Sequence, residues 1–223
     1  MTQILHKTDH ELKTAIVDEL EWTPSVNPDR IAVSVDNGAI TLSGQVETYP
    51  EKQAATRAVM HLRGVTAVAD EIEVKNGWAP RDDADIAREA SEAIDRMVYV
   101  PAGAVQAKVH NHVITLSGAL TWDYQREAAR AAMAGLRGVH GVINTISLKP
   151  TAVIAPTEAK AKIIAALVRK ARFDGQHITV HVNGTEIELR GSVSSWAELR
   201  QAGYAAWATP GVTNVKNLLV VSY

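Results

Sequence analysis

The sequence predicts an α+β protein made of three tandem αββαβ modules, each a mixed three-stranded sheet with two helices on one face. The first observation is a repeat: three similar hairpin segments end at glycines 74 and 73 residues apart, Gly44, Gly118 and Gly191. The second is a further glycine 20 residues after each of these, at Gly64, Gly138 and Gly211. The third is the same order of helix-like and strand-like apolar patterns in all three copies.

The first helix and first strand of each copy are predicted from the spacing of apolar residues. An apolar stripe with helical period occupies residues 12–20, 86–97 and 163–168. Apolar residues then alternate with mostly polar ones over 31–35, 105–109 and 178–182. This alternation indicates strands with one buried side and one solvent-facing side.

A tight turn is predicted to join this strand to a second strand. Asn37-Gly38 and Asn183-Gly184 are typical of two-residue hairpin turns because both residue types tolerate positive φ, and Asn111-His112 takes this place in the second copy. The third copy has one additional residue before its closing glycine, which predicts a bulge or a longer turn there. The second strands are expected around 40–42, 114–116 and 187–189.

The second helix of each copy is predicted between its two glycines, and a last strand follows. Thr48 with Glu51, and Ser195 with Glu198, have the spacing of helix capping boxes. A crossover through this helix makes the last strand parallel to the second strand. We expect the six glycines to serve as turn and helix-stop residues, where positive φ or close packing is needed.

Length and composition limit the remaining possibilities. The chain has 223 residues, of which 46% are hydrophobic and 22% charged, as in ordinary globular proteins. We expect domain borders at 1–76, 77–151 and 152–223. No run approaches the ~20 apolar residues of a membrane-spanning helix. The first residues do not resemble a signal peptide, so we expect a cytoplasmic protein that can lie peripherally at a membrane.

Catalytic signatures are absent from the sequence. It contains no phosphate-binding loop, no Gly-x-Ser-x-Gly elbow and no His-Glu-x-x-His helix, and it has no cysteine for a nucleophile, disulfide or thiolate metal site. Histidine pairs such as His6 with His10 have no evident third ligand. We therefore predict a protein that is not an enzyme and has no cofactor and no metal site.

Charge differs between the copies although the whole chain is close to neutral. Residues 1–75 carry a net charge of −5, residues 76–150 are neutral, and residues 151–223 carry +3. The excess in the third copy gathers on its first helix, at Lys160, Lys162, Arg169, Lys170 and Arg172. Such a cluster attracts anionic lipid, but it is equally typical of a solvated helix face. The opposite charges of the first and third copies also favour association between molecules.

Aromatic side chains mark the junction of the second strand and second helix. Trp122, Tyr124 and Trp196 lie there. Beside a helix N-terminus these rings are suited to a lipid headgroup region. The alternative is that they cover the small core or pack between copies. The slightly negative chain, without basic and aromatic residues interleaved on one strand face, argues against nucleic-acid binding.

The residues at fixed positions resemble the BON domain family. The resemblance rests on the Gly-x-x-x-Leu-Ser-Gly hairpin, the alanine-rich second helix, the Gly-Val-x-x-Val-x-Asn segment, the hairpin leucines, and the Asn144 and Asn217 positions, where the first copy has Asp70. The hairpin leucines are Leu42, Leu116 and Leu189. All three copies match, so the resemblance covers nearly the whole chain.

The resemblance implies a binding protein without catalytic activity. Family members include osmotically induced periplasmic proteins, outer-membrane lipoproteins with paired BON domains, and a cytoplasmic potassium-binding protein. By this resemblance the chain is expected to bind anionic phospholipid or envelope components under osmotic or envelope stress. A holdase-like chaperone or self-assembling scaffold, with proteins or further copies of itself as partners, is the second hypothesis. A potassium-type ion sensor is the third.

Overall fold

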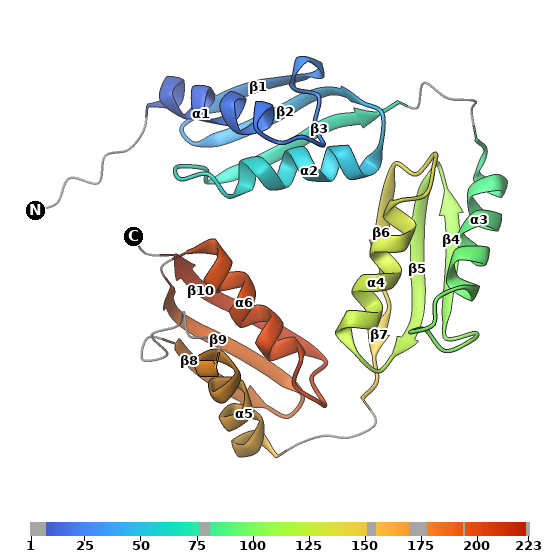
Figure 1. The fold of residues 1–223 in the computed structure, drawn as a ribbon, viewed down its shortest axis with the longest axis vertical. Coiled ribbons are helices and arrows are strands. Elements are labelled where there is room, and N and C mark those ends of the chain that lie inside the picture. Colours follow the sequence, from blue (N-terminus) through green and yellow to red (C-terminus); the bar gives the residue numbers. More distant parts are fainter. Residues whose placement is uncertain (1–7, 76–80, 151–154, 170–177, 194, 222–223) are drawn as a thin grey trace, which may run out of the picture. The chain divides into compact units, whose positions relative to one another are not determined.

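The computed structural model describes residues 8–75, 81–150, 155–169, 178–193 and 195–221. It contains the predicted order of helix, strand, strand, helix, strand three times (Figure 1). We call these units modules one, two and three. The fold class predicted from the sequence is therefore confirmed. Each module is described by itself below.

Module one consists of α1 (Asp9–Glu21), the short 3-10 helix η1 (Pro28–Arg30), β1 (Ile31–Asp36), β2 (Ala39–Val46), α2 (Tyr49–Met60) and β3 (Ala67–Val74). Module two consists of α3 (Asp83–Asp95), β4 (Val105–His110), β5 (Val113–Leu120), α4 (Asp123–Ala134), β6 (Gly141–Asn144) and β7 (Ser147–Leu148). Module three consists of α5 (Pro156–Arg169), β8 (Ile178–Asn183), β9 (Glu186–Val193), α6 (Trp196–Trp207) and β10 (Asn214–Val221).

The sheets have the predicted mixed pairing. The first and second strands form an antiparallel hairpin, as in the pairing of Ile31 with Gly44. The last strand runs parallel to the second strand, which places the second strand in the centre of each sheet. In module two the last strand is interrupted at Thr145 and Ile146, so β6 and β7 pair separately with β5.

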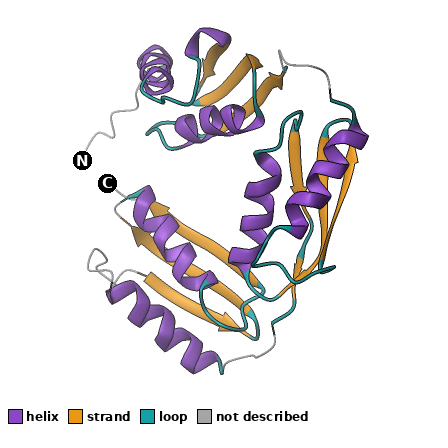
Figure 2. Ribbon diagram, turned by 45° about the vertical axis from the view of Figure 1, so that its right-hand side comes forward, coloured by secondary structure: helices purple, strands orange, loops and turns teal. Residues whose placement is uncertain are grey.

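The core of each module lies between one face of the sheet and its two helices (Figure 2). In module one, Leu12, Ile16 and Leu20 of α1 pack with Ile40 and Leu42 of β2. Alanines at equivalent positions of the second helices, Ala55, Ala129 and Ala202, are fully buried. Their small side chains let the helix approach the sheet closely. The opposite face of each sheet is not covered by the helices of its own module (Figure 2).

The glycines that close the hairpin strand in modules one and two occupy positions that no larger residue fits. Gly44 and Gly118 both have a φ of 134°. A Cβ on Gly118 would lie 2.1 Å from the carbonyl oxygen of Ala104, and a Cβ on Gly44 would lie 2.0 Å from that of Arg30. The backbone is also at positive φ at Gly64, Gly138, Gly191 and Gly211.

The hairpin turn of module three differs from the sequence expectation. Asn183 pairs with Glu186, so the two turn residues are Gly184 and Thr185, and there is neither a bulge nor a longer turn. Asn183 is the last residue of its strand and takes the place of Asp36 and His110 in the other modules. The additional residue before Gly191 therefore reflects a shift of the turn pair by one position.

A repeated side-chain contact fastens the last strand of each module to its second helix. In modules two and three, the amide nitrogens of Asn144 and Asn217 donate to the carbonyl oxygens of Arg126 (3.0 Å) and Leu199 (2.9 Å). In module one Asp70 stands at this position and cannot donate. Instead, the ammonium of Lys52 lies 3.3 Å from the Asp70 carboxylate.

Candidate functional site

The basic residues predicted on α5 do not form one continuous surface in the part of the chain that is described. Lys160 and Lys162 are both exposed. They are two residues apart, which places them about 200° apart around a helix. Lys162 forms an ion pair with Glu158 at 2.7 Å, whereas Lys160 is outside the groove that Lys162 lines. Arg169 is the last residue of α5, and its side chain is not among those described. Lys170 and Arg172 lie outside the described residues.

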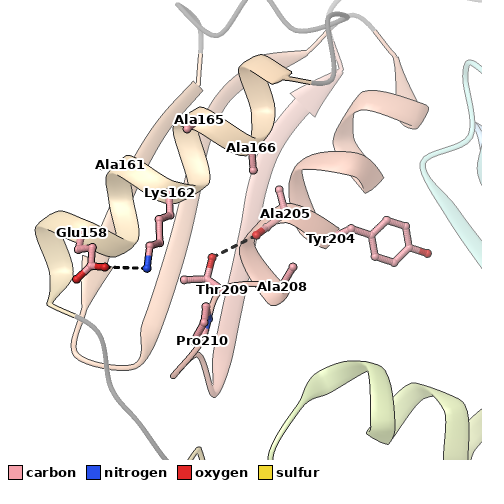
Figure 3. Close-up of a pocket in the computed structure, with 10 residues that line it drawn as sticks. All are labelled: Glu158, Ala161, Lys162, Ala165, Ala166, Tyr204, Ala205, Ala208, Thr209 and Pro210. Carbon is pink, nitrogen blue, oxygen red and sulfur yellow. Dashed lines mark hydrogen bonds and ion pairs between the residues drawn. The ribbon is translucent and has the colours of Figure 1, made fainter.

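A groove of about 800 Å³ runs between α5 and α6 (Figure 3). Its lining is largely apolar and small, with Ala161, Ala165 and Ala166 on α5 and Ala205 on α6. The Tyr204 side chain is 67% exposed and points away from α5 (Figure 3). At the position of Ala165, module one has Asp18 and module two has Glu92. This apolar lining is therefore a property of module three.

The predicted aromatic residues of module two lie together with two residues that sequence reasoning missed. We call Val98, Tyr99, Trp122 and Tyr124 the aromatic patch. The rings of Tyr99 and Tyr124 are edge to face with centroids 6.3 Å apart, and the rings of Trp122 and Tyr124 are 6.5 Å apart. Val98 is 92% exposed, Tyr99 63% and Tyr124 57%, while Trp122 is half-buried. Large apolar side chains gathered in this way on a surface mark an interaction site.

A buried glutamine holds the two segments of the aromatic patch in place. The amide nitrogen of Gln125 donates to the carbonyl oxygen of Tyr99 at 2.6 Å. Its side-chain oxygen accepts hydrogen bonds from the backbone N–H groups of Thr121 (3.2 Å) and Trp122 (3.0 Å). The loop before β4 is thereby fixed to the start of α4. These bonds join the two segments of the aromatic patch directly, so they fix the positions of its backbone.

An ion pair lies at the start of α4, next to Trp122 and Tyr124 in the sequence. Asp123, the first residue of α4, forms an ion pair with Arg126. Burial raises the pKa of the Asp123 carboxyl above its usual value, and the guanidinium of Arg126 opposes that shift.

The other modules have no equivalent of the aromatic patch at the corresponding positions of the sequence. Module one has Pro24, Ser25, Thr48 and Pro50 there. Module three has Ser195 and Ala197 in place of Trp122 and Tyr124. Trp196 begins α6, and its side chain lies outside the description. The signal that would have identified Val98 and Tyr99 is the apolar run Met97-Val98-Tyr99-Val100, which follows the end of α3 in a loop.

A second distinctive feature of module two is a corner formed by two histidines. The rings of His112 in the hairpin turn and His140 before β6 are stacked, with centroids 4.6 Å apart and planes 15° apart. Nε2 of His112 lies 2.9 Å from the carbonyl oxygen of Arg81, so this nitrogen carries the hydrogen. The carboxylate of Asp83 accepts from the backbone N–H groups of Asn111 and His112, both at 2.9 Å.

These contacts shift two ionisations in the corner. The backbone hydrogen bond from His112 is the main cause that lowers the pKa of Asp83. Burial lowers the pKa of His140, and the nearby His112 adds to this effect. Modules one and three have Gly38 with Thr66 and Thr185 with Thr213 at the same two positions, so the histidine pair occurs only in module two.

The part of the chain that is described contains no cluster of three or more His, Asp or Glu side chains arranged to hold a metal ion. None of its helices is long and apolar enough to cross a bilayer.

Comparison with known proteins identifies a similar sequence. Osmotically-inducible protein Y of Escherichia coli (strain K12) is 26% identical over 146 residues, covering 62% of this chain and 70% of that protein. Solved structures with a related arrangement have low overall similarity. The C-terminal domain of CdsD, a structural protein of the type III secretion system of Chlamydia trachomatis, covers 100% of both chains with 16% identity and a TM-score of 0.28.

The periplasmic domain of the inner-membrane protein PrgH of S. typhimurium gives 13% identity over 87% of this chain and 95% of that one, with a TM-score of 0.23. Structural similarity at this level carries no argument about function. The family comparison is decisive, because residues 8–76, 82–150 and 157–223 each match the BON domain. These three matches follow the repeated glycines, the hairpins and the strand-to-helix contacts described above, and the chain belongs to the BON domain family.

Proposed function

We propose that this protein is a non-enzymatic BON-domain binding protein that associates with anionic phospholipid at an envelope membrane during osmotic stress. Membership of the BON family and similarity to an osmotically inducible protein support an envelope-associated role in osmotic stress. The single observation that carries the lipid proposal is the aromatic patch of module two.

The chemistry of the aromatic patch fits a membrane interface. Tyr and Trp rings favour the headgroup level of a bilayer because each combines an apolar ring with a polar group. Val98 at the edge of the patch is nearly fully exposed in water. Burial of such a side chain in the acyl region contributes about 1.5 kcal/mol or more. The fixed backbone around Gln125 means that little ordering is required on binding.

The attraction to anionic lipid is assigned to the basic residues of α5. Lys160 and Lys162 are exposed, and each lysine near an anionic surface contributes about 1 kcal/mol. Arg169, Lys170 and Arg172 follow in the sequence and add to the same charge excess. The proposed binding therefore combines an aromatic contact in module two with a longer-range attraction from module three.

Vesicle flotation of the full chain tests this proposal. Neutral and anionic vesicles are compared at low and high salt with the parent chain and a Val98→Asp, Tyr99→Ser double variant. Tyr99→Ser copies Ser25 of module one, and it leaves the backbone acceptor of Gln125 unchanged. Tyr204→Ser is the matched control, because Tyr204 is an equally exposed tyrosine outside the patch.

We expect the parent chain and Tyr204→Ser to float with anionic vesicles and the double variant to lose most of this binding. Binding should weaken at high salt because surface attraction decays within a Debye length. Equal flotation of the parent and the double variant would remove the patch from the proposal. Absence of flotation for the parent would reject lipid association itself.

A second candidate function, holdase-like binding of exposed apolar segments, is supported by the groove between α5 and α6. The test is suppression of aggregation of a heat-denatured client protein by the full chain. Ala165→Asp places the residue of module one, Asp18, in the groove. Loss of suppression with unchanged vesicle flotation would support the holdase function. Unchanged suppression would reject the groove as its site.

A further inference from the structure

The last strand of module three is an edge strand with unusual outward side chains. β10 lies at one edge of its sheet, in the order β10-β9-β8, and no other described strand pairs with its outer side. Alternate residues of this eight-residue strand therefore direct backbone N–H and C=O groups to a side without a strand partner, where the Asn217 side chain accepts from the N–H of Leu219 at 3.3 Å. Such an edge is a template for pairing with another strand unless the sequence protects it.

The three modules provide an internal comparison at this edge. The relevant positions on the helix-free face are the fifth and seventh of the last strand. Module one has Glu71 and Glu73 there, and module three has Leu218 and Val220, which are 51% and 64% exposed. Carboxylates discourage the approach of another sheet edge, whereas apolar side chains favour it.

Module two protects its edge in a different way. Thr145 and Ser147 stand at the two positions, and their hydroxyls donate to the carbonyl oxygens of Leu116 (2.6 Å) and Gly118 (3.0 Å). The strand is also interrupted between β6 and β7. A short, broken edge strand pairs poorly with a further strand. Among the edge strands of the described residues, β10 alone is continuous with two large apolar side chains exposed.

We propose that β10 pairs with β10 of a second copy of this chain, antiparallel and with a two-fold axis at Leu218. This register places the two Leu218 side chains opposite each other on the helix-free face. It places Lys216 of each copy opposite Val220 of the other. The interface is isologous, so it closes at two chains and does not continue into a fibre.

The outward side chains of β10 favour a second β10 over the edge strand β3 of module one. Lys216 lies 3.9 Å from Glu186 of its own module, so its charge is already balanced by β9. In the proposed register Lys216 faces an apolar residue, and its aliphatic stem can cover Val220. Pairing of β10 with β3 would instead set Leu218 and Val220 against Glu71 and Glu73. This self-association is independent of the proposed lipid binding.

Single cysteines test the register directly because the chain contains no cysteine of its own. Directly opposed residues of antiparallel strands have Cα atoms about 4.5–5.5 Å apart, which a disulfide spans. The two Val220 residues would be about 14 Å apart, at ~3.4 Å per residue along the strand. Leu218→Cys should form a disulfide-linked dimer under mild oxidation, and the similarly exposed Val220→Cys should not. Equal yields of dimer from the two variants, or none from Leu218→Cys, would overturn the proposal.

Sedimentation of the full chain over a range of concentrations gives an independent test. The parent chain should form a dimer, and Leu218→Glu with Val220→Glu, which copies module one, should be monomeric. Ile143→Glu is the control, because Ile143 is an exposed residue of the last strand in module two. It should leave the dimer unchanged. A parent chain that stays monomeric, or a dimer that persists in the double variant, would contradict pairing through β10.

Discussion

The contact between the last strand and the second helix shows how one residue position is satisfied in two chemical ways. Asn217 and Asn144 use the two ends of an amide: the nitrogen donates to the helix, and the oxygen accepts from the backbone N–H two residues on, at 3.3 Å and 3.1 Å respectively. Asp70 keeps the second bond, to Ile72 at 3.2 Å, but cannot make the first. The ammonium of Lys52 replaces it and also donates to the carbonyl oxygen of Ile72 at 2.6 Å.

This pairing predicts unequal effects of two reciprocal substitutions. Asn144→Asp places a carboxylate against the carbonyl oxygen of Arg126 and removes its hydrogen bond, so we expect a loss of about 1–3 kcal/mol in unfolding free energy. Asp70→Asn keeps an acceptor for Ile72 and gains a donor, so its cost should be smaller. Chemical denaturation of both full-length variants measures the difference, and equal costs would contradict the explanation.

The stacked histidines of module two predict that the stability of this module depends on pH. The pKa of His140 is lowered from its usual 6.5 in the folded chain, so the unfolded chain binds more protons as the pH falls through that value. The unfolding free energy should therefore decrease between about pH 6.5 and the lower folded pKa. Asp83 acts in a separate range. Its lowered pKa gives stability that is present above its usual 3.8 and is lost as the pH falls through the folded pKa.

Three equivalent backbone amides measure this effect with internal controls. The N–H groups of Thr66, His140 and Thr213 each donate to the hairpin turn of their own module, at 2.8–2.9 Å. Hydrogen exchange, corrected for intrinsic rates, should show reduced protection of the His140 amide at pH 5.5 relative to pH 7.5, with Thr66 and Thr213 unchanged. A His112→Gly, His140→Thr variant copies Gly38 and Thr66 of module one, where Gly38 has a positive φ as His112 does, and should abolish the difference. Protection that is equal at both pH values in the parent chain would show that the pair does not sense pH.

At the scale of elements, the helix α5 shows that a count of basic residues does not tell how their side chains are arranged. Five basic residues in its sequence neighbourhood predicted either attraction of anionic lipid or a solvated helix face. Among the described residues, Lys160 and Lys162 lie about 200° apart around the helix, and Lys162 pairs with Glu158. The basic residues of α5 can therefore attract an anionic surface over a distance, but they do not form one specific contact site.

This distinction leads to a prediction for a charge reversal on α5. Lys162→Glu, Arg169→Glu and Lys170→Glu together should abolish or strongly weaken flotation with anionic vesicles. The fold should be retained, since Lys162 is exposed and Ile163 supplies the buried side chain beside it. Circular dichroism checks the fold, and flotation checks the binding. Binding that persists in the reversed variant would show that α5 does not supply the attraction.

Most elements could be predicted from the sequence because their signals are local. Thr48 and Ser195 cap α2 and α6, as their spacing to Glu51 and Glu198 predicts, and Thr8 with Glu11 forms a complete capping box at α1. The turn of module three was misplaced because Asn-Gly and Gly-Thr both suit a two-residue turn, and strand register decides between them. Tyr99 was missed because its proximity to Tyr124 depends on a hydrogen bond between segments 26 residues apart.

At the scale of the whole molecule, three copies of one scaffold carry different surfaces. Module one is acidic, module two has the aromatic patch and the histidine corner, and module three has the groove and the unprotected edge of β10. The residues that give the modules these different surfaces are outward-facing or at corners. Buried positions stay apolar, and some keep the same residue in all copies, as Leu42, Leu116 and Leu189 do.

We predict that a fragment of residues 77–151 folds without the other two modules. It contains a complete set of elements, and its buried residues come from its own helices and sheet. Circular dichroism should show mixed helix and strand content with a cooperative thermal transition. An unstructured fragment beside a folded full-length chain would show that the three copies form one obligate unit.

The path of the chain through each module has a consequence for how such an array can grow. Asp9 at the start of α1 binds the hairpin turn through the N–H groups of Asn37 and Gly38, whereas β3 ends beside Val46 at the far end of the sheet. The chain therefore enters and leaves a module at opposite poles, separated by a strand of about 26 Å at ~3.3 Å per residue. Duplication or loss of one entire copy still joins an exit pole to an entry pole. Copy number can thus change in evolution without reversing the path of the chain through a module, and a pull on the two ends of one copy acts along its strands.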